Sequence, residues 1–215
     1  MKQPWPRENA VAWTKQQKYF AVIRHVSSQT ARGAIEALIK GGFKLVEIDA
    51  TVLGVLDIVK EYSRRPGFMI GVGALYSQRA AADALKAGAH FLGTLHMDPA
   101  LIRLAHRHKT MISVGGLTPT EIVAGWTEGA DLIKVVPSGP LGGPDYIKML
   151  RSFFPEIPLM PSGDVTLGNI KNYFLAGATA VGLGEGLLSE SHLTEGRWQE
   201  ITLQAKRFQD ILRKY

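Results

Sequence analysis

The sequence predicts an α/β protein folded as a single (β/α)8 barrel, and three observations predict it. The chain has 215 residues, a length at which parallel α/β barrels commonly form one undivided domain. Eight short β-rich runs alternate with longer segments whose apolar residues recur at helical spacing. A glycine precedes a strand-like run at Gly41, Gly88, Gly129 and Gly177. The rival class, a doubly wound open sheet, lacks its expected GxGxxG motif after the first strand.

Each element is predicted from its own residues, in chain order. The strands are expected at 19–24, 44–49, 68–72, 90–94, 110–114, 131–136, 157–160 and 179–183. The helices are expected within 30–42, 53–65, 77–88, 98–109, 118–129, 144–154, 166–177 and 196–214. Several helical segments begin with Ser, Thr or Asp and end with Gly, as capped helices do. An N-terminal helical extension completes the single domain, residues 1–215.

Composition excludes several classes of function. The net charge of +6 favours anionic small molecules but is too small to predict nucleic-acid binding. The chain contains no cysteine, which excludes thiol catalysis, disulfides and zinc–thiolate sites. No apolar run has the length of a signal peptide core or a membrane span. We therefore expect a cytoplasmic protein with no membrane or nucleic-acid partner.

Charged residues lie near the C-terminal ends of three predicted strands. These are Arg24, Glu47 with Asp49, and Lys134, which stands in the apolar run "DLIKVV". Side chains at this end of a barrel strand point into the mouth, where barrel enzymes carry out chemistry. Burying such a group costs several kcal/mol, roughly, unless it is paired. Lys134 is therefore either one half of a buried ion pair, a lysine whose amine reaches solvent, or a reactive amine.

The reactive interpretation uses the chemistry of a buried amine. Desolvation disfavours the ammonium form, so more free amine is available to attack a carbonyl group. The resulting Schiff base accepts electrons from an adjacent carbon–carbon bond, and a nearby carboxyl group can move the proton. Glu47 is the candidate carboxyl. Counted from the repeated glycines, however, Glu47 and Lys134 differ by one position, so they share a cavity only if the strand registers differ.

Seven segments carry a resemblance to a known family. They are "AVIR", "GGFKLVEI", "IGVGAL", "AGAHF", "LTPTEI", "LIKVVP" and "AGATAVGLG", in that order. From about Tyr19 to Leu188, their order and spacing resemble the bacterial 2-keto-3-deoxy-6-phosphogluconate / 4-hydroxy-2-oxoglutarate (KDPG/KHG) aldolases. These are class I, Schiff-base lyases built as trimers of (β/α)8 barrels. The matching positions imply that Lys134 forms the Schiff base, Glu47 transfers the proton and Arg24 contacts the substrate.

The resemblance also implies the reaction and its requirements. The substrate is a 2-keto-3-deoxy or 4-hydroxy-2-oxo acid, cleaved to pyruvate and an aldehyde, which is glyoxylate in some members. No metal and no organic cofactor is required, and the assembly is a homotrimer. The further substrate-binding positions are Thr51, Gly73, Ala74, Thr94, Pro137, Ser162, Gly163, Asp164, Gly184 and Glu185.

The chain departs from the family at both ends of the expected substrate. Ala74 replaces a threonine that contacts the pyruvate end, and Thr51 stands where many members have arginine. At the phosphate end, Asp164 replaces a glycine and Glu185 replaces a serine. A carboxylate about 5 Å from a phosphate costs roughly 3 kcal/mol at an effective dielectric of about 20.

We therefore expect a substrate with a neutral tail or with none, such as oxaloacetate, which the same Schiff base can decarboxylate. Two alternatives would leave phosphate binding intact. Asp164 could serve a helix N-terminus, and Glu185 could point into solvent. The alternative function, suggested by the lost threonine and serine, is a catalytically silent barrel that binds a metabolite or a protein partner.

Overall fold

The computed structural model describes residues 5–215 and confirms the barrel, with each predicted strand found within two residues of its expected ends. The strands are β1 (Tyr19–Ile23), β2 (Leu45–Asp49), β3 (Met69–Gly73), β4 (Phe91–Gly93), β5 (Met111–Gly115), β6 (Leu132–Val135), β7 (Leu159–Pro161) and β8 (Val181–Leu183). They form one parallel sheet in the order β7-β6-β5-β4-β3-β2-β1-β8. A single bridge between Ser162 and Gly182 joins the two edges and closes the ring.

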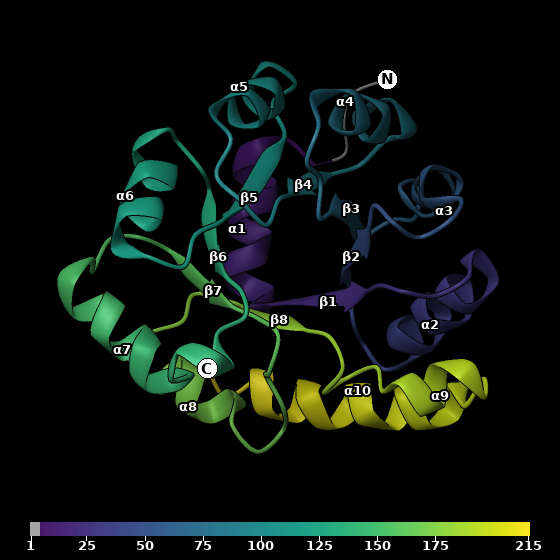
Figure 1. The fold of residues 1–215 in the computed structure, drawn as a ribbon. Helices are drawn as coiled ribbons and strands as arrows, with labels where there is room; N and C mark the ends of the chain where they lie inside the picture. Colours follow the sequence, from purple (N-terminus) through teal and green to yellow (C-terminus); the bar gives the residue numbers. More distant parts are fainter. Residues whose placement is uncertain (1–4) are drawn as a thin grey trace.

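Helices surround the ring of strands (Figure 1). They are α1 (Arg7–Gln17), α2 (Ser28–Lys40), α3 (Val55–Tyr62), α4 (Gln78–Ala87), α5 (Pro99–Arg107), α6 (Pro119–Thr127), α7 (Pro144–Phe153), α8 (Ile170–Leu175), α9 (Glu190–Thr194) and α10 (Trp198–Leu212), with a 3-10 turn η1 (Gly139–Leu141). Ser77 and Asp98, the first residues of their predicted segments, cap α4 and α5 by accepting backbone N–H bonds. Ser27 caps α2 in the same way, three residues before the predicted start of that segment. The short elements η1 and α9 were not predicted.

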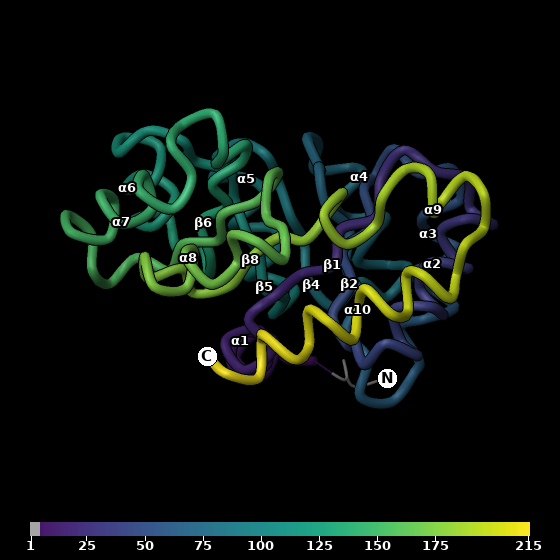
Figure 2. The backbone as a smooth tube through the Cα atoms, turned by 90° about the horizontal axis from the view of Figure 1, so that it is seen from below, coloured from purple at the N-terminus to yellow at the C-terminus, as the bar shows by residue number. Residues whose placement is uncertain are grey.

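Helix α1 is the predicted N-terminal extension, and it lies across the N-terminal end of the barrel. Arg7 bonds the carboxylate of Asp131 at 2.9 Å, and its backbone N–H donates to the carbonyl of Lys109. Figure 2 shows the end of α10 beside α1, where the Lys18 amine donates to the Tyr215 carbonyl. Because this end is covered, the barrel opens at the C-terminal ends of its strands.

The barrel interior is packed with side chains from strands that are not neighbours in the sheet. The rings of Phe20 on β1 and Phe91 on β4 meet edge to face, with centroids 5.1 Å apart. Two strands separate β1 from β4, so this contact crosses the interior. The phenylalanines form an apolar layer inside the ring, as the alternating inward residues of a barrel do.

Candidate active site

Lys134 and Glu47 meet inside the barrel. The Nζ atom of Lys134 lies 2.6 Å from Oε1 and 2.8 Å from Oε2 of Glu47. Both residues are buried, with exposed fractions of 2% and 3%. They come from β6 and β2, which are not adjacent, so the contact crosses the interior. Lys134 lies five residues after Gly129, whereas Glu47 lies six residues after Gly41. Despite this difference of one residue, the strand registers bring the two side chains into the same interior.

Two glycines leave the space that the Glu47 carboxyl group occupies. A Cβ atom on Gly73 would lie 2.2 Å from Glu47 Oε1, and one on Gly93 would lie 2.8 Å from Oε2. Neither glycine has a left-handed backbone, so it is the missing side chain that matters here. Gly73 was a predicted site residue, whereas Gly93 was missed. Its signal was a glycine inside a strand, which often marks a close approach of another group.

Ser113 is a second residue that the sequence reasoning missed. It lies on β5, is fully buried, and is paired in the sheet with Gly93. Its Oγ atom lies 3.3 Å from the position that a Cβ of Gly93 would take, which places the hydroxyl beside the Lys134–Glu47 pair. The available signal was weak, because a lone serine in the apolar run "TMISV" is common in buried strands.

Three predicted residues gather at the mouth between β1 and β8. They line one pocket of about 300 Å³ and are Arg24, Gly184 and Glu185. The same pocket is also lined by His25 and by a second glutamate, Glu190. Arg24 and Glu185 are both exposed. The pocket thus combines one guanidinium group with two carboxylates and has no excess of positive charge.

Asp164 belongs to the loop after β7, and a hydrogen-bond network holds its carboxylate. Its carboxylate accepts bonds of 2.6 Å from the Ser138 hydroxyl and 2.6 Å from the Tyr173 hydroxyl. Burial and this carboxylate raise the pKa of Tyr173, which stays a proton donor. The interpretation of Asp164 as a group serving the helix N-terminus is wrong, because α8 begins at Ile170 with Asn169 as its N-cap.

Pro137, Gly163, Ser162 and Thr94 were also predicted to bind substrate, and each follows a strand of the barrel. Gly163 lies against Pro137, whose Cα would be 3.4 Å from a Cβ at that glycine. Ser162 directly follows β7, and its side chain lies against Gly182. The Thr94 hydroxyl donates to the carbonyl of His96.

Thr51 and Ala74 follow β2 and β3. The Thr51 hydroxyl and N–H both donate to Asp49 Oδ1, which makes a local turn. Ala74 has a left-handed backbone with φ of 53°, an uncommon conformation for a residue with a side chain. The substrate-binding roles of these two residues, and of Ser162, Gly163, Pro137 and Thr94, stay predictions.

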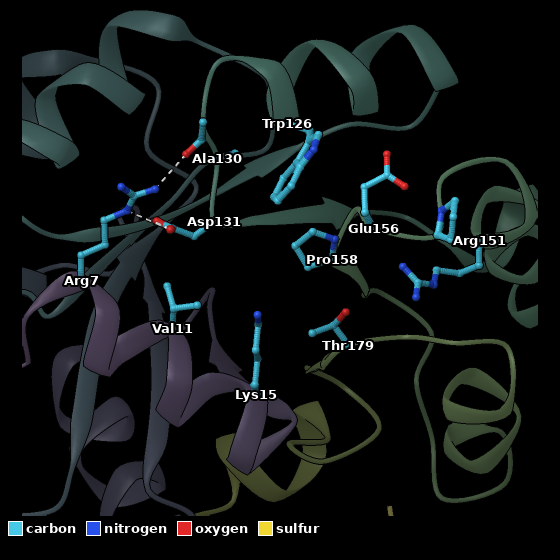
Figure 3. Close-up of a pocket in the computed structure, with 12 residues that line it drawn as sticks. Arg7, Val11, Lys15, Trp126, Ala130, Asp131, Arg151, Glu156, Pro158 and Thr179 are labelled. Carbon is cyan, nitrogen blue, oxygen red and sulfur yellow. Dashed lines mark hydrogen bonds and ion pairs between the residues drawn. The ribbon is translucent and has the colours of Figure 1, made fainter.

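A larger pocket, of about 430 Å³, lies at the opposite end of the barrel, between α1 and the starts of β6, β7 and β8 (Figure 3). Arg7 and Asp131 face each other there, and the other charged residues of the lining are Lys15, Arg151 and Glu156. This pocket is remote from Lys134, so it is not the site of the buried pair.

Residues 5–215 contain neither a candidate metal site nor a helix that could cross a membrane. No group of three or more His, Cys, Asp or Glu side chains there is placed to hold a metal ion. Within the same range, no helix combines the length and the apolar character that crossing a membrane requires.

The fold and the buried pair define a parallel α/β-barrel enzyme with an amine and a carboxyl group at its centre. Residues 11–204 match the family model described as KDPG and KHG aldolase. The chain belongs to this family, whose members are lyases.

Individual relatives agree with this assignment. The 2-dehydro-3-deoxy-phosphogluconate aldolase of Pseudomonas aeruginosa is 29% identical over 167 residues, which cover 77% of this chain and 76% of that protein. A cube-shaped cage designed by fusing symmetric oligomeric domains is 25% identical, with a TM-score of 0.80 over 92% of this chain and 72% of that one. The KDPG aldolase of Legionella pneumophila, with pyruvate captured at low pH as a covalent carbinolamine intermediate, shares the fold: TM-score 0.81, 22% identity, and coverage of 91% and 96%.

Proposed function

We propose that this protein is a Schiff-base aldolase that cleaves a 2-keto-3-deoxy or 4-hydroxy-2-oxo acid to pyruvate and an aldehyde, which is glyoxylate for the hydroxy-oxo acid 4-hydroxy-2-oxoglutarate. The observation that carries the proposal is the buried contact between Lys134 Nζ and the Glu47 carboxyl group, at 2.6 and 2.8 Å. An amine and a proton carrier in direct contact are the two groups that this chemistry needs. Family membership supports the same reaction.

The proposed reaction uses the two groups in turn. Glu47 takes a proton from the Lys134 ammonium, and the free amine adds to the ketone carbon C2. Glu47 then gives that proton to the carbinolamine hydroxyl, which leaves as water and yields a protonated Schiff base. Glu47 takes the proton of the C4 hydroxyl while the C3–C4 electron pair moves into the Schiff base, which releases the aldehyde and leaves an enamine. Glu47 then returns the proton to C3, and water hydrolyses the Schiff base to pyruvate and free Lys134. No step needs a metal or an organic cofactor.

The charges at the mouth favour a substrate whose far end is uncharged. Glu185 and Glu190 line the same pocket as Arg24. The loop after β7 carries a further carboxylate at Asp164, directly after Gly163. A phosphate dianion in the mouth would meet carboxylates, at a cost of roughly 3 kcal/mol for each pair about 5 Å apart. We therefore propose a hydroxylated, unphosphorylated tail, or a short acid such as oxaloacetate, which the Schiff base would decarboxylate.

The assembly we propose is a homotrimer. Leu53, Tyr76 and Leu95 are 81%, 77% and 55% exposed, and they follow the neighbouring strands β2, β3 and β4. Large apolar side chains gathered on adjacent loops are typical of a contact surface. Analytical ultracentrifugation is expected to give three times the chain mass of 23.5 kDa. Tyr76→Glu should shift the protein to monomer, and a monomeric wild type would end this proposal.

Borohydride trapping with pyruvate tests the chemistry. The wild-type protein should gain the mass of one reduced pyruvate adduct at Lys134, whereas Lys134→Ala should gain none. Lys86→Ala is the matched control, because Lys86 is an exposed lysine on α4. The absence of an adduct on the wild type would favour the catalytically silent barrel. Steady-state rates on phosphorylated and unphosphorylated 2-keto-3-deoxy acids test the tail separately, and a strong preference for the phosphate would overturn only that part.

A further inference from the structure

The Ser113 hydroxyl group is buried without a partner. The residue has an exposed fraction of 0%, and its Oγ atom makes no hydrogen bond with any group of residues 5–215. Most buried hydroxyl groups are hydrogen-bonded, because leaving one unpaired costs free energy. An unpaired hydroxyl in the centre of a barrel therefore calls for an explanation in terms of what it meets during the reaction.

The position of Gly93 shows what this hydroxyl faces. Three polar atoms surround the point that a Cβ of Gly93 would occupy: Glu47 Oε2 at 2.8 Å, Lys134 Nζ at 3.3 Å and Ser113 Oγ at 3.3 Å. Gly93 and Ser113 are paired residues on β4 and β5. Because Gly93 has no side chain, no side-chain atom of that residue separates the hydroxyl from the Lys134–Glu47 pair at this point.

The chemistry at Lys134 changes the number of donors that Glu47 can use. In the free protein the Lys134 amine donates to both carboxylate oxygens. An ammonium group has three N–H bonds. Condensation with a ketone converts the ammonium and the carbonyl into a protonated Schiff base and one water molecule. Two of the three N–H hydrogens leave in that water, no net proton is consumed, and one N–H remains. Glu47 then has two oxygens but at most one N–H from Lys134.

We propose that Ser113 is a positioning residue that donates a hydrogen bond to the Glu47 carboxylate once Lys134 has become a Schiff base. Rotation about Cα–Cβ moves the serine oxygen and rotation about C–O turns its hydrogen, so the side chain can replace the lost N–H without movement of the backbone. The bond is made in the intermediate and not in the free protein. Interactions of that kind favour the reaction rather than the resting state. This inference rests on the proposed Schiff-base function.

The test compares pyruvate adduct formation by the full-length wild type, Ser113→Ala and Ser113→Thr. With pyruvate and borohydride, Ser113→Ala should need on the order of tenfold more pyruvate for half-maximal trapping, since it loses a hydrogen bond to a charged group. Its kcat for aldol cleavage should fall, while its melting temperature should not, because an unpaired hydroxyl has been removed. Ser113→Thr keeps the hydroxyl and should restore trapping. Ser152→Ala, a serine on the surface of α7, is the control.

The outcomes separate this inference from the function on which it rests. If the wild type forms no adduct, the Schiff-base function itself fails. If the wild type forms the adduct and Ser113→Ala traps pyruvate with the same concentration dependence and the same kcat, the role of Ser113 is overturned while the function stands. A fall in the melting temperature of Ser113→Ala would also count against the inference, because it would mean that the hydroxyl is bonded in the free protein.

Discussion

At the scale of single residues, the Lys134–Glu47 contact is the interaction whose loss should matter most. Both groups are almost fully buried, and each is the other's counter-charge. A buried ion pair is often no more stable than apolar residues of similar volume, because removing two charges from water is costly. The pair is therefore explained better by chemistry than by stability. Breaking it from one side only should nevertheless be severe.

A thermodynamic cycle on this pair tests that argument. Glu47→Gln leaves the Lys134 ammonium buried without a counter-charge and should lower the free energy of unfolding by about 3–5 kcal/mol. Lys134→Met should have a similar effect on Glu47. The double substitution should lose less than the sum of the two, because no unpaired charge remains. Urea unfolding at pH 7 measures all three.

The exposed pair between Arg32 and Glu61 provides the comparison for this cycle. Its side chains are 36% and 51% exposed, so Glu61→Gln should change stability by no more than about 1 kcal/mol. Equal effects of Glu47→Gln and Glu61→Gln would show that the barrel interior admits enough water to solvate Lys134.

The residues that sequence reasoning found and missed differ in the signal they carry. A lysine or a glutamate in an apolar strand is conspicuous, so Lys134 and Glu47 could be predicted. Gly93 and Ser113 are small residues that fit any buried strand, and their importance follows only from which side chains lie opposite them. Asp164 has two hydrogen-bond partners, Ser138 and Tyr173, and neither lies near it in the sequence. No local sequence pattern could therefore predict these hydrogen bonds.

At the scale of elements, the site depends on how closely β2 and β3 approach. The two strands pair from Leu45 with Met69 to Asp49 with Gly73. The positions of these strands could be predicted from their apolar runs. The register that turns Glu47 and Lys134 toward one another, however, is fixed by packing around the closed ring. That register could not be read from the sequence, and neither could the short helix α9.

Gly73→Ala tests the importance of this close approach. The added Cβ would lie 2.2 Å from Oε1 and 2.4 Å from Cδ of Glu47, so the carboxyl group must move away from Lys134. A displacement of about 1 Å at a reacting group can lower kcat by roughly 100-fold, and we expect a fall of that order. Gly168→Ala is the control, because its Cβ would meet nothing nearer than Thr166 Oγ1 at 3.7 Å. Wild-type kcat in Gly73→Ala would show that Glu47 need not stay where it lies.

At the scale of the whole molecule, the two ends of the barrel have different tasks. The C-terminal end carries the open mouth and the pair that we propose reacts, whereas helix α1 covers the N-terminal end. Groups buried at the covered end include Asp131 and His90, which precedes β4 and accepts the backbone N–H of Ile70. Burial lowers the pKa of His90 from 6.5 to about 4, because the interior disfavours its charged form. Acid sensitivity of the fold is therefore expected at the end away from the chemistry.

The stability of the barrel should consequently fall as the pH falls from 6.5 toward 4. In that range the unfolded chain protonates His90 and the folded chain does not, so protons favour unfolding. Above pH 6.5 the ring is neutral in both states, so protonation of His90 no longer lowers the stability. Between pH 7.5 and pH 5 this one group should remove about 2 kcal/mol of unfolding free energy.

His90→Asn isolates that contribution, because asparagine can still accept the N–H of Ile70 but does not titrate. Burial raises the pKa of Asp131 and lowers that of His106, so other groups also tilt the pH profile, in opposite directions. Their effects are common to both proteins and cancel in the difference between wild type and variant. Urea unfolding at the two pH values should show the advantage of wild type over His90→Asn shrinking as the solution is acidified. If the difference in unfolding free energy between wild type and His90→Asn stays constant, His90 takes up its proton equally in the folded and unfolded states. The acid sensitivity would then have to arise from other groups.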